Sequence, residues 1–287
     1  MDFKVINTTT SDELLNAIAD NQNNNFKVGA GFTDLINQLK KQNTEDLTII
    51  NIAQLKEAAY TQIIEEDISL TIGTLATASD IVANRYVKEN YPVLHRAASK
   101  LACTQIRNVA TLGGNICNVS PSGDMTAALI ALKATCHIVD CNGRERAELL
   151  NDFIIGLKKT SLTKKELIRN ITIPKNTETN IKSGYEKVGS RKSMEIAIVS
   201  LAYHLQIDND GVIVNAGVAC GAVAPTIPFT VSACEFIIGK NIKHISDDDK
   251  EEFANKVMEY ASPISDLRAT QWYRKEVLFN LSKTIFD

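Results

Sequence analysis

One polar segment, residues 105–124, constrains this chain more than any other part of its sequence. It reads QIRNVATLGGNICNVSPSGD and separates two stretches of apolar, helix-like sequence. Two adjacent glycines, Gly113 and Gly114, are followed by hydroxyl and amide side chains. A plain connection between two helices needs few polar groups, whereas a long, polar, glycine-bearing loop is typical of a functional segment. We therefore expect residues 111–123 to form a loop that binds a ligand.

A second glycine loop, Gly29-Ala30-Gly31, follows a predicted strand at residues 26–28 and precedes a predicted helix. Backbone N–H groups in such a loop can converge on an anion such as phosphate, and the helix N-terminus adds a favourable partial charge. A Rossmann fingerprint is disfavoured, because its third small residue would fall at Asp34, whose carboxylate would face the pyrophosphate. The alternative is a tight strand-to-helix turn in which Thr33 caps the helix.

The N-terminal part of the chain predicts an α+β arrangement. Ser11 is expected to cap a helix that runs to Asp20, and the first fifty residues then form a small β-α-β unit. A strongly apolar helix is expected at residues 125–133. Further predicted strands are 47–52, 69–72, 135–140 and 166–173, and further predicted helices are 78–88 and 93–101.

The polar stretch 175–182 is the predicted domain boundary. We expect one domain at 1–175, with subdomains at about 1–55 and 56–175, and a second at 180–287. The second domain reads as strands followed by helices, which is an α+β pattern. Its predicted strands are 184–188, 196–207 and 212–222, with a turn at 208–211, and its predicted helices are 231–238, 247–260 and 271–286.

Composition excludes several classes of function. The net charge of −3 argues against a nucleic-acid-binding protein, and no apolar stretch approaches the roughly 18 residues that span a bilayer. The six cysteines form no C-x2-C pair and the four histidines are dispersed, so we expect no metal site. Free, buried thiols in a reducing cytoplasm are the simplest interpretation, and no secretory signal is visible.

The two loops together resemble the flavin motifs of the FAD-binding subunit of the molybdenum hydroxylases, the family of xanthine, carbon monoxide and nicotinate dehydrogenases. That family's first motif is A-G-G-T-D-L and its second is Q-I-R-N-x-G-T-x-G-G-N-(x)n-S-P-x-x-D. This chain carries them at residues 30–35 and 105–124. Phe32 replaces the second glycine of the first motif, and Glu195 stands where many relatives have Asp. Further matches lie at residues 72–75, 191–197, 221–226, 266–269 and 273–274.

The resemblance implies an α+β fold with an FAD-binding domain of the p-cresol methylhydroxylase (PCMH) and vanillyl-alcohol oxidase type, made of two α+β subdomains. A C-terminal α+β domain with an antiparallel sheet and helices would follow, as in the carbon monoxide dehydrogenase flavoprotein. The implied cofactor contacts come from Lys27, Val28, Gly29, Ala30, Gly31, Phe32, Thr33, Asp34 and Leu35, from Ala102, Thr111, Leu112, Gly113, Gly114, Asn115, Asn118, Ser120 and Asp124, and from Leu167, Ile168 and Lys187.

Four of these implied contacts have alternative interpretations. Asp124 would bond the cofactor, or it would cap the helix that follows it. Leu167 and Ile168 would cover the adenine or flavin region, or they would be ordinary core-strand residues. Lys187 would lie near the flavin pyrimidine edge and stabilise the anionic reduced flavin, or it would be a strand lysine facing solvent.

The implied function is electron transfer within an oxidoreductase. A partner large subunit would hold molybdopterin and hydroxylate a purine or other N-heteroaromatic substrate, and a small subunit would hold two [2Fe–2S] clusters. Electrons would pass through FAD in this chain to NAD+ or another acceptor, with no catalytic side chain here. The alternatives are a flavin-free scaffold subunit with the same fold and a stand-alone flavin oxidoreductase.

Overall fold

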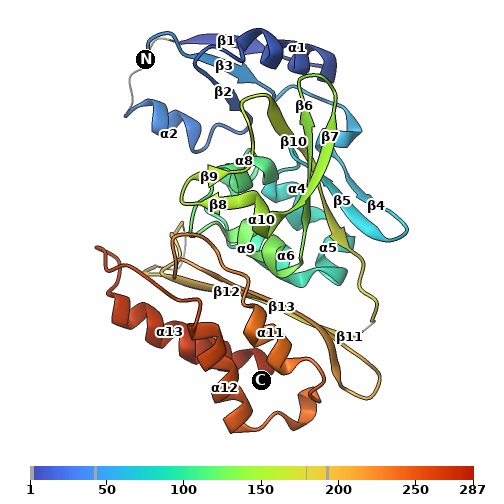
Figure 1. The fold of residues 1–287 in the computed structure, drawn as a ribbon, viewed down its shortest axis with the longest axis vertical. Coiled ribbons are helices and arrows are strands. Elements are labelled where there is room, and N and C mark those ends of the chain that lie inside the picture. The colour runs from blue at the N-terminus through green and yellow to red at the C-terminus, as the bar shows by residue number, and fades with distance from the viewer. Residues whose placement is uncertain (1–2, 42–43, 179, 192–193) are drawn as a thin grey trace.

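The computed structural model describes residues 3–41, 44–178, 180–191 and 194–287. Figure 1 shows three units stacked along the long axis of the molecule, with the N-terminal subdomain at the top and the C-terminal domain at the bottom. The architecture is α+β, as predicted, with parallel pairing in one small sheet and antiparallel pairing in the others. Among the described helices, none is long and apolar enough to cross a membrane.

The N-terminal subdomain is the predicted β-α-β unit with one further strand. Its parallel sheet has the order β1-β3-β2 and is packed against α1, whose Leu14 and Ile18 are buried. The predicted cap at Ser11 is wrong by one residue, because Thr10 has the extended backbone and its hydroxyl accepts the Glu13 N–H. The elements are β1 (Lys4–Asn7), α1 (Ser11–Asn21), β2 (Phe26–Gly29), α2 (Leu35–Leu39) and β3 (Thr48–Asn51).

The second subdomain is an antiparallel sheet covered by helices. Its strand order is β4-β5-β10-β6-β7, and a separate two-stranded hairpin joins β8 to β9. The strands are β4 (Ile63–Glu65), β5 (Ser69–Gly73), β6 (Thr135–Asp140), β7 (Glu145–Leu149), β8 (Ile154–Gly156), β9 (Lys159–Thr160) and β10 (Glu166–Pro174). The strands β4 and β7 to β9 were not predicted, because they are short and lack a distinct alternating pattern.

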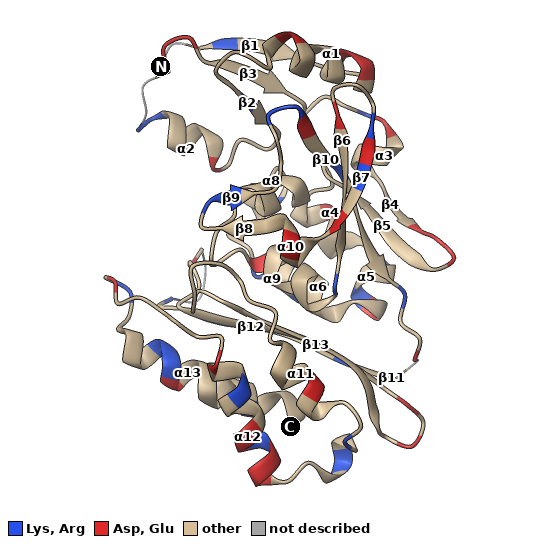
Figure 2. Cartoon of the chain, viewed as in Figure 1, with Lys and Arg blue, Asp and Glu red and all other residues tan. Residues whose placement is uncertain are grey.

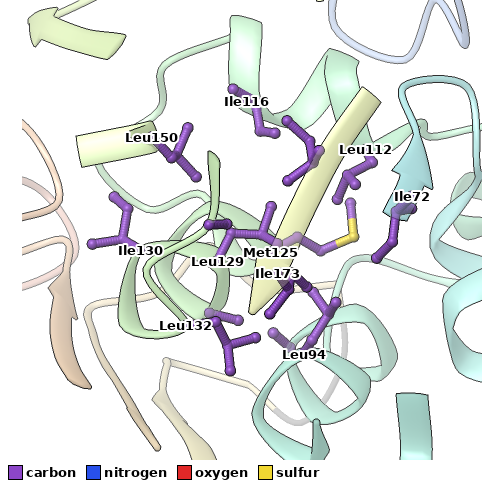
Figure 3. Packing of buried hydrophobic residues seen from close by; sticks show 14 of the residues in the cluster. Ile72, Leu94, Leu112, Ile116, Met125, Leu129, Ile130, Leu132, Leu150 and Ile173 are labelled. Carbon is purple, nitrogen blue, oxygen red and sulfur yellow. The ribbon is translucent and has the colours of Figure 1, made fainter. Parts of the chain in front are cut away.

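The helices of this subdomain enclose the largest core. All residues of α9 are buried, so this helix is apolar on every side, and Figure 3 shows Met125 and Leu129 surrounded by apolar side chains from sheet and helices. The predicted helix at 78–88 is divided, because Asn84 ends one helix and caps the next. The helices are α3 (Ala58–Thr61), α4 (Ala78–Ala83), α5 (Arg85–Asn90), α6 (Pro92–Ser99), α7 (Thr104–Arg107), α8 (Leu112–Cys117), α9 (Asp124–Ala131) and α10 (Leu150–Phe153).

The C-terminal domain is a three-stranded antiparallel sheet between two layers of helices. Helices α6 and α9 of the preceding domain lie on one face, and α11 and α13 lie on the other (Figure 1). Strand β12 is therefore buried along nearly its whole length. The elements are β11 (Asn180–Val188), β12 (Val199–Ile207), β13 (Ile213–Gly221), α11 (Val231–Ile237), the 3-10 helix η1 (Ile242–His244), α12 (Asp247–Met258), α13 (Gln271–Lys283) and the 3-10 helix η2 (Thr284–Phe286).

Charged residues are distributed over all three units. Figure 2 shows Lys and Arg interspersed with Asp and Glu along the elements, with the densest acidic segment at the start of α12. Helix α12 gains from this arrangement, because acidic side chains near a helix N-terminus interact favourably with the exposed N–H groups. These acidic side chains therefore stabilise helix α12. The described Lys and Arg residues form no continuous basic stripe in this view.

Candidate functional site

A cleft of about 650 Å³ lies where the three units meet. The first glycine loop lines one wall, and the segment from residue 101 to residue 124 lines another. The start of β10 and residues 194–196, from the C-terminal domain, complete it. Nearly all of the predicted cofactor contacts line this cleft, although they are up to 141 positions apart in the chain. The exceptions are Leu112, which is buried in the core, and Lys187.

The first glycine loop supplies free hydrogen-bond donors. Residues 30–35 all line the cleft, and their backbone N–H groups donate to no acceptor among the described residues. Lys27 lines the same wall and adds a positive charge. Consecutive free N–H groups beside a cation form a binding site for an anion, and a diphosphate suits it well. The predicted helix cap at Thr33 is wrong, because Asp34 occupies the cap position and makes no side-chain capping bond.

The second glycine segment differs from its prediction. Residues 111–123 are not a continuous loop, because α8 begins at Leu112. The N-terminal N–H groups of α8 already have acceptors: Leu112 donates to Ala76 O at 2.9 Å, Gly113 to Thr74 O at 2.8 Å, and Gly114 to Thr111 Oγ1 at 3.1 Å. Because its glycines have no side chains, a ligand can come close to the backbone of this segment. The segment adds few free hydrogen-bond donors, however.

The polar side chains of this segment mainly hold the walls of the cleft together. Asn118 Oδ1 accepts from Gln38 Nε2 at 3.3 Å and from Lys158 Nζ at 2.9 Å, which joins α8 to α2 and to the β8–β9 turn. Asn115 Oδ1 accepts from the backbone N–H of Thr126 at 3.1 Å. These amides thus define the shape of the cleft even before any contact with a ligand.

The inner end of the cleft contains a buried ion pair. Asp124, the first residue of α9, lines the cleft, and Lys187 Nζ lies 2.9 Å from its Oδ1 and 3.1 Å from its Oδ2. The Tyr185 hydroxyl donates to Asp124 Oδ1 at 2.5 Å. The Lys187 side chain is only 2% exposed, so the interpretation of a solvent-facing lysine is wrong. The capping interpretation of Asp124 is also wrong, because Gly123 occupies the cap position.

Burial controls the electrostatics of this pair. It raises the pKa of the Asp124 carboxyl, and the Lys187 ammonium and the Tyr185 hydroxyl oppose that effect by favouring the carboxylate. Burial, reinforced by the adjacent carboxylate, raises the pKa of the Tyr185 phenol far above its usual range. Tyr185 is therefore a neutral hydrogen-bond donor at every physiological pH.

The apolar residues of β10 named in the sequence analysis are core-strand residues that also line the cleft. Leu167 and Ile168 are 5% and 3% exposed and pack in two different core clusters, yet both line the cleft. Ala102 also lines it, with a positive φ of 40°. These residues provide an apolar surface next to the polar loops, which suits a ligand with both aromatic and anionic parts.

Several lining residues were not predicted. Thr74, Leu75, Glu195 and Ile196 lie within segments 72–75 and 191–197, whose resemblance to the family was the signal that could have identified them. Residues 192 and 193 of the latter segment lie outside the described part. The same signal covers Met194 in segment 191–197, and the motif at 105–124 contains Ile106, Ala110, Cys117, Ser122 and Gly123. No sequence signal distinguishes the remaining ones from ordinary core or surface residues: Gln38, Ile52, Leu101, Leu162 and Glu166.

In the described part of the chain, no three potential metal ligands, cysteines included, lie close together. All six thiols are free. The expectation that they are buried holds for Cys136, Cys220 and Cys234, whereas Cys117 is exposed and lines the cleft.

Comparisons with known families match both parts of the chain. Residues 1–176 match the family model described as the FAD binding domain in molybdopterin dehydrogenase. Residues 185–287 match the model of the CO dehydrogenase flavoprotein C-terminal domain. The first match ends two residues after β10, and the second begins within β11.

Individual relatives agree with these matches. The glyceraldehyde dehydrogenase medium chain of Sulfolobus acidocaldarius is 32% identical over 92% of this chain and 90% of its own length. The xanthine dehydrogenase FAD-binding subunit of Escherichia coli O157:H7 is 30% identical over 97% and 92%. A carbon monoxide dehydrogenase structure from Hydrogenophaga pseudoflava shares the fold, with a TM-score of 0.90 at 24% identity over 99% of this chain and 96% of its own. The chain therefore belongs to the FAD-binding subunits of the molybdenum hydroxylase family of oxidoreductases.

Proposed function

We propose that this chain is the FAD-containing electron-transfer subunit of a molybdenum hydroxylase. It would receive electrons from the [2Fe–2S] clusters of a partner subunit and deliver them to NAD+ or to another acceptor. The observation that carries the proposal is the glycine-lined cleft, in which the N–H groups of residues 30–35 lack acceptors among the described residues and face a space of about 650 Å³. Bound FAD supplies the redox chemistry, and the protein supplies binding, orientation and electrostatics.

Different parts of the cleft suit different parts of that cofactor. The free N–H groups and Lys27 match a diphosphate, which needs several donors and a compensating positive charge. At the inner end, the Lys187 ammonium pairs with the Asp124 carboxylate and favours its charged form, so that Asp124 can accept hydrogen bonds from the cofactor. Leu167 and Ile168 offer the apolar surface that an aromatic ring system requires.

The partners follow from the family. We expect a molybdopterin-binding large subunit and an iron–sulfur small subunit, assembled with this chain in the cytoplasm. The hydroxylated substrate would be a purine or another N-heteroaromatic compound, bound by the large subunit. The xanthine dehydrogenase relative from Escherichia coli O157:H7 supports that substrate class.

The first experiment is a visible spectrum of the purified chain, followed by heat release and identification of the cofactor. Released FAD at about one per chain supports the proposal, since one cleft holds one dinucleotide diphosphate. A colourless chain that also fails to bind added FAD would identify a flavin-free scaffold and overturn it. A chain with FAD that oxidises a substrate without any partner would instead identify a stand-alone oxidoreductase.

A second experiment tests the electron acceptor. The flavin-loaded chain is reduced anaerobically and then mixed separately with NAD+ and with an artificial quinone acceptor. Rapid reoxidation by NAD+ supports delivery of electrons to NAD+. Reoxidation by the quinone alone would assign another acceptor and would leave the electron-transfer role in place.

A further inference from the structure

The strand β11 places two side chains on one face, aimed at a single carboxylate. Tyr185 and Lys187 are two positions apart, so they point to the same side of the strand. Both contact Asp124, which belongs to the preceding domain: the Tyr185 hydroxyl at 2.5 Å and the Lys187 ammonium at 2.9 Å. The carboxylate that lines the cleft is thus held entirely by the C-terminal domain.

Two side chains donate hydrogen bonds to the Asp124 carboxylate. Tyr185 donates to Oδ1, and Lys187 donates to Oδ2 while it also lies close to Oδ1. Among the described residues, Lys187 Nζ makes one further hydrogen bond, to the backbone carbonyl of Lys100 at 3.2 Å. A lysine side chain is flexible, so its ammonium position depends on the groups that accept its hydrogen bonds. The orientation of Asp124 therefore fixes the position of the Lys187 ammonium.

Tyr185 is well suited to hold that orientation. Its side chain is fully buried and belongs to the large core cluster, so its ring cannot move away from Asp124 without opening the core. A hydrogen bond from a neutral group to a buried carboxylate is among the stronger ones in proteins. Without it, Lys187 would be the one described side chain that bonds the Asp124 carboxylate, and the carboxylate could rotate.

We propose that Tyr185 is a positioning residue of the cofactor site: its hydroxyl fixes the Asp124 carboxylate, and through it the Lys187 ammonium, at the inner end of the cleft. This inference rests on the proposed function in assigning the cleft to FAD. The groups that set the charge here are Asp124 on α9, Tyr185 and Lys187 on β11, and Glu195 in the following loop. The Lys100 carbonyl, at the end of α6, adds a further acceptor.

The first test needs no cofactor. The purified chain is treated with an amine-selective acetylating reagent, and the labelling of Lys187 is measured by mass spectrometry relative to Lys100, whose side chain is 39% exposed. We expect Lys187 to be protected in the wild type. In Tyr185→Phe, which removes only the hydroxyl, its relative labelling should rise about tenfold, because a hydrogen bond to a charged acceptor affects populations by about that factor.

A matched control is available on the neighbouring strand. Tyr203 is also buried in this sheet, but its hydroxyl has no hydrogen bond to any described residue. Tyr203→Phe should leave Lys187 protected. Wild-type labelling of Lys187 in Tyr185→Phe, or equal labelling in both variants, would overturn the inference. Tyr185→Leu repeats the measurement with a different apolar side chain in case the first variant does not fold.

The second test uses the flavin-loaded chain. Tyr185→Phe should weaken FAD binding or shift the flavin midpoint potential, and in an Asp124→Ala background the same change should have no further effect. Additive effects would overturn the inference, because they would mean that Tyr185 acts independently of Asp124. A wild type that binds no FAD would overturn the proposed function, whereas the labelling result would still decide the role of Tyr185.

Discussion

The Cα atom of Gly31 lies directly against the backbone carbonyl of Val109. A Cβ atom built on Gly31 would lie 1.8 Å from the Val109 oxygen, which is far inside any allowed contact. This approach joins the first glycine loop to the segment between α7 and α8, and both line the cleft. The glycine is therefore required by the contact between two distant segments as much as by the ligand.

The first prediction concerns this contact. Gly31→Ala should displace the first loop, because the atom in the way is backbone and cannot move aside. We expect FAD affinity to fall at least tenfold, and the free energy of unfolding to fall by about 1–3 kcal/mol, as for an overpacked site. Equilibrium binding and urea unfolding measure the two quantities.

Gly156→Ala is the matched control for that prediction, because a Cβ atom at Gly156 would meet nothing within 4 Å. It should change neither quantity appreciably. Wild-type affinity in Gly31→Ala would show that the loop accommodates a side chain, and that the close contact does not determine the site.

The second prediction concerns Gly114, which faces the cleft. A Cβ atom there would meet only Thr111 Oγ1, at 2.9 Å, so the space beyond it belongs to the cleft. Gly114→Trp should fill that space, abolish flavin retention and leave the chain folded. Gly114→Ala should keep most of the flavin, because only a rotatable hydroxyl must shift. Flavin at wild-type stoichiometry in the Trp variant would contradict the assignment of this wall.

Much of this site could be predicted from local sequence, and the physical reason is the glycine pattern. The loop at residues 29–31 and the pair Gly113 and Gly114 mark places where the backbone comes close to another segment or to a ligand. Such places can be recognised from the sequence alone, because only glycine lacks a side chain. The helix α8 was missed because Leu112 and Gly113 bond to carbonyls of Ala76 and Thr74. These acceptors are nearly forty positions away, and glycines in a helix reduce the local signal.

The ion pair at the inner end of the cleft could not be predicted from local sequence. Lys187 lies on a strand whose sequence suits solvent exposure as well as burial, and its burial depends on α6 packing against β11 and on the ion pair with Asp124 of α9. Its partner Asp124 is 63 positions earlier in the chain. Sequence reasoning could name both residues through the family motif, but the pairing, and the role of Tyr185, depend on how the two domains pack.

The third prediction concerns Phe32, which has a φ of 58° in the left-handed region. Its ring lies against Gly29 and packs beside the cluster that contains Leu39 and Ile49. Replacing it loses apolar burial, so both Phe32→Gly and Phe32→Ala should destabilise the chain. The glycine variant should nevertheless be the more stable of the two by about 1 kcal/mol, because the Cβ atom of alanine is strained in the left-handed backbone conformation. Urea unfolding of the two variants measures this difference, and a more stable alanine variant would contradict it.

The fourth prediction concerns His204 in β12 and the pH dependence of stability. Its Nδ1 lies 3.0 Å from Ser183 Oγ, and its Nε2 lies 2.8 Å from Asn176 Oδ1. Burial, with a smaller effect of Lys133, lowers the pKa of His204 from 6.5 to about 4. Between these values the unfolded chain binds a proton that the folded chain does not, so stability is lost as the pH falls from 6.5.

The loss from His204 alone should reach at most about 3 kcal/mol at pH 4. His204→Asn should therefore have a flatter stability profile between pH 7 and pH 4 than the wild type, whatever its stability at pH 7. Urea unfolding at several pH values measures the slopes, and His244→Gln, at an exposed histidine, serves as the control. Equal slopes in the His204 variant and the wild type would mean that His204 takes up its proton without unfolding, and that burial does not hold the ring neutral.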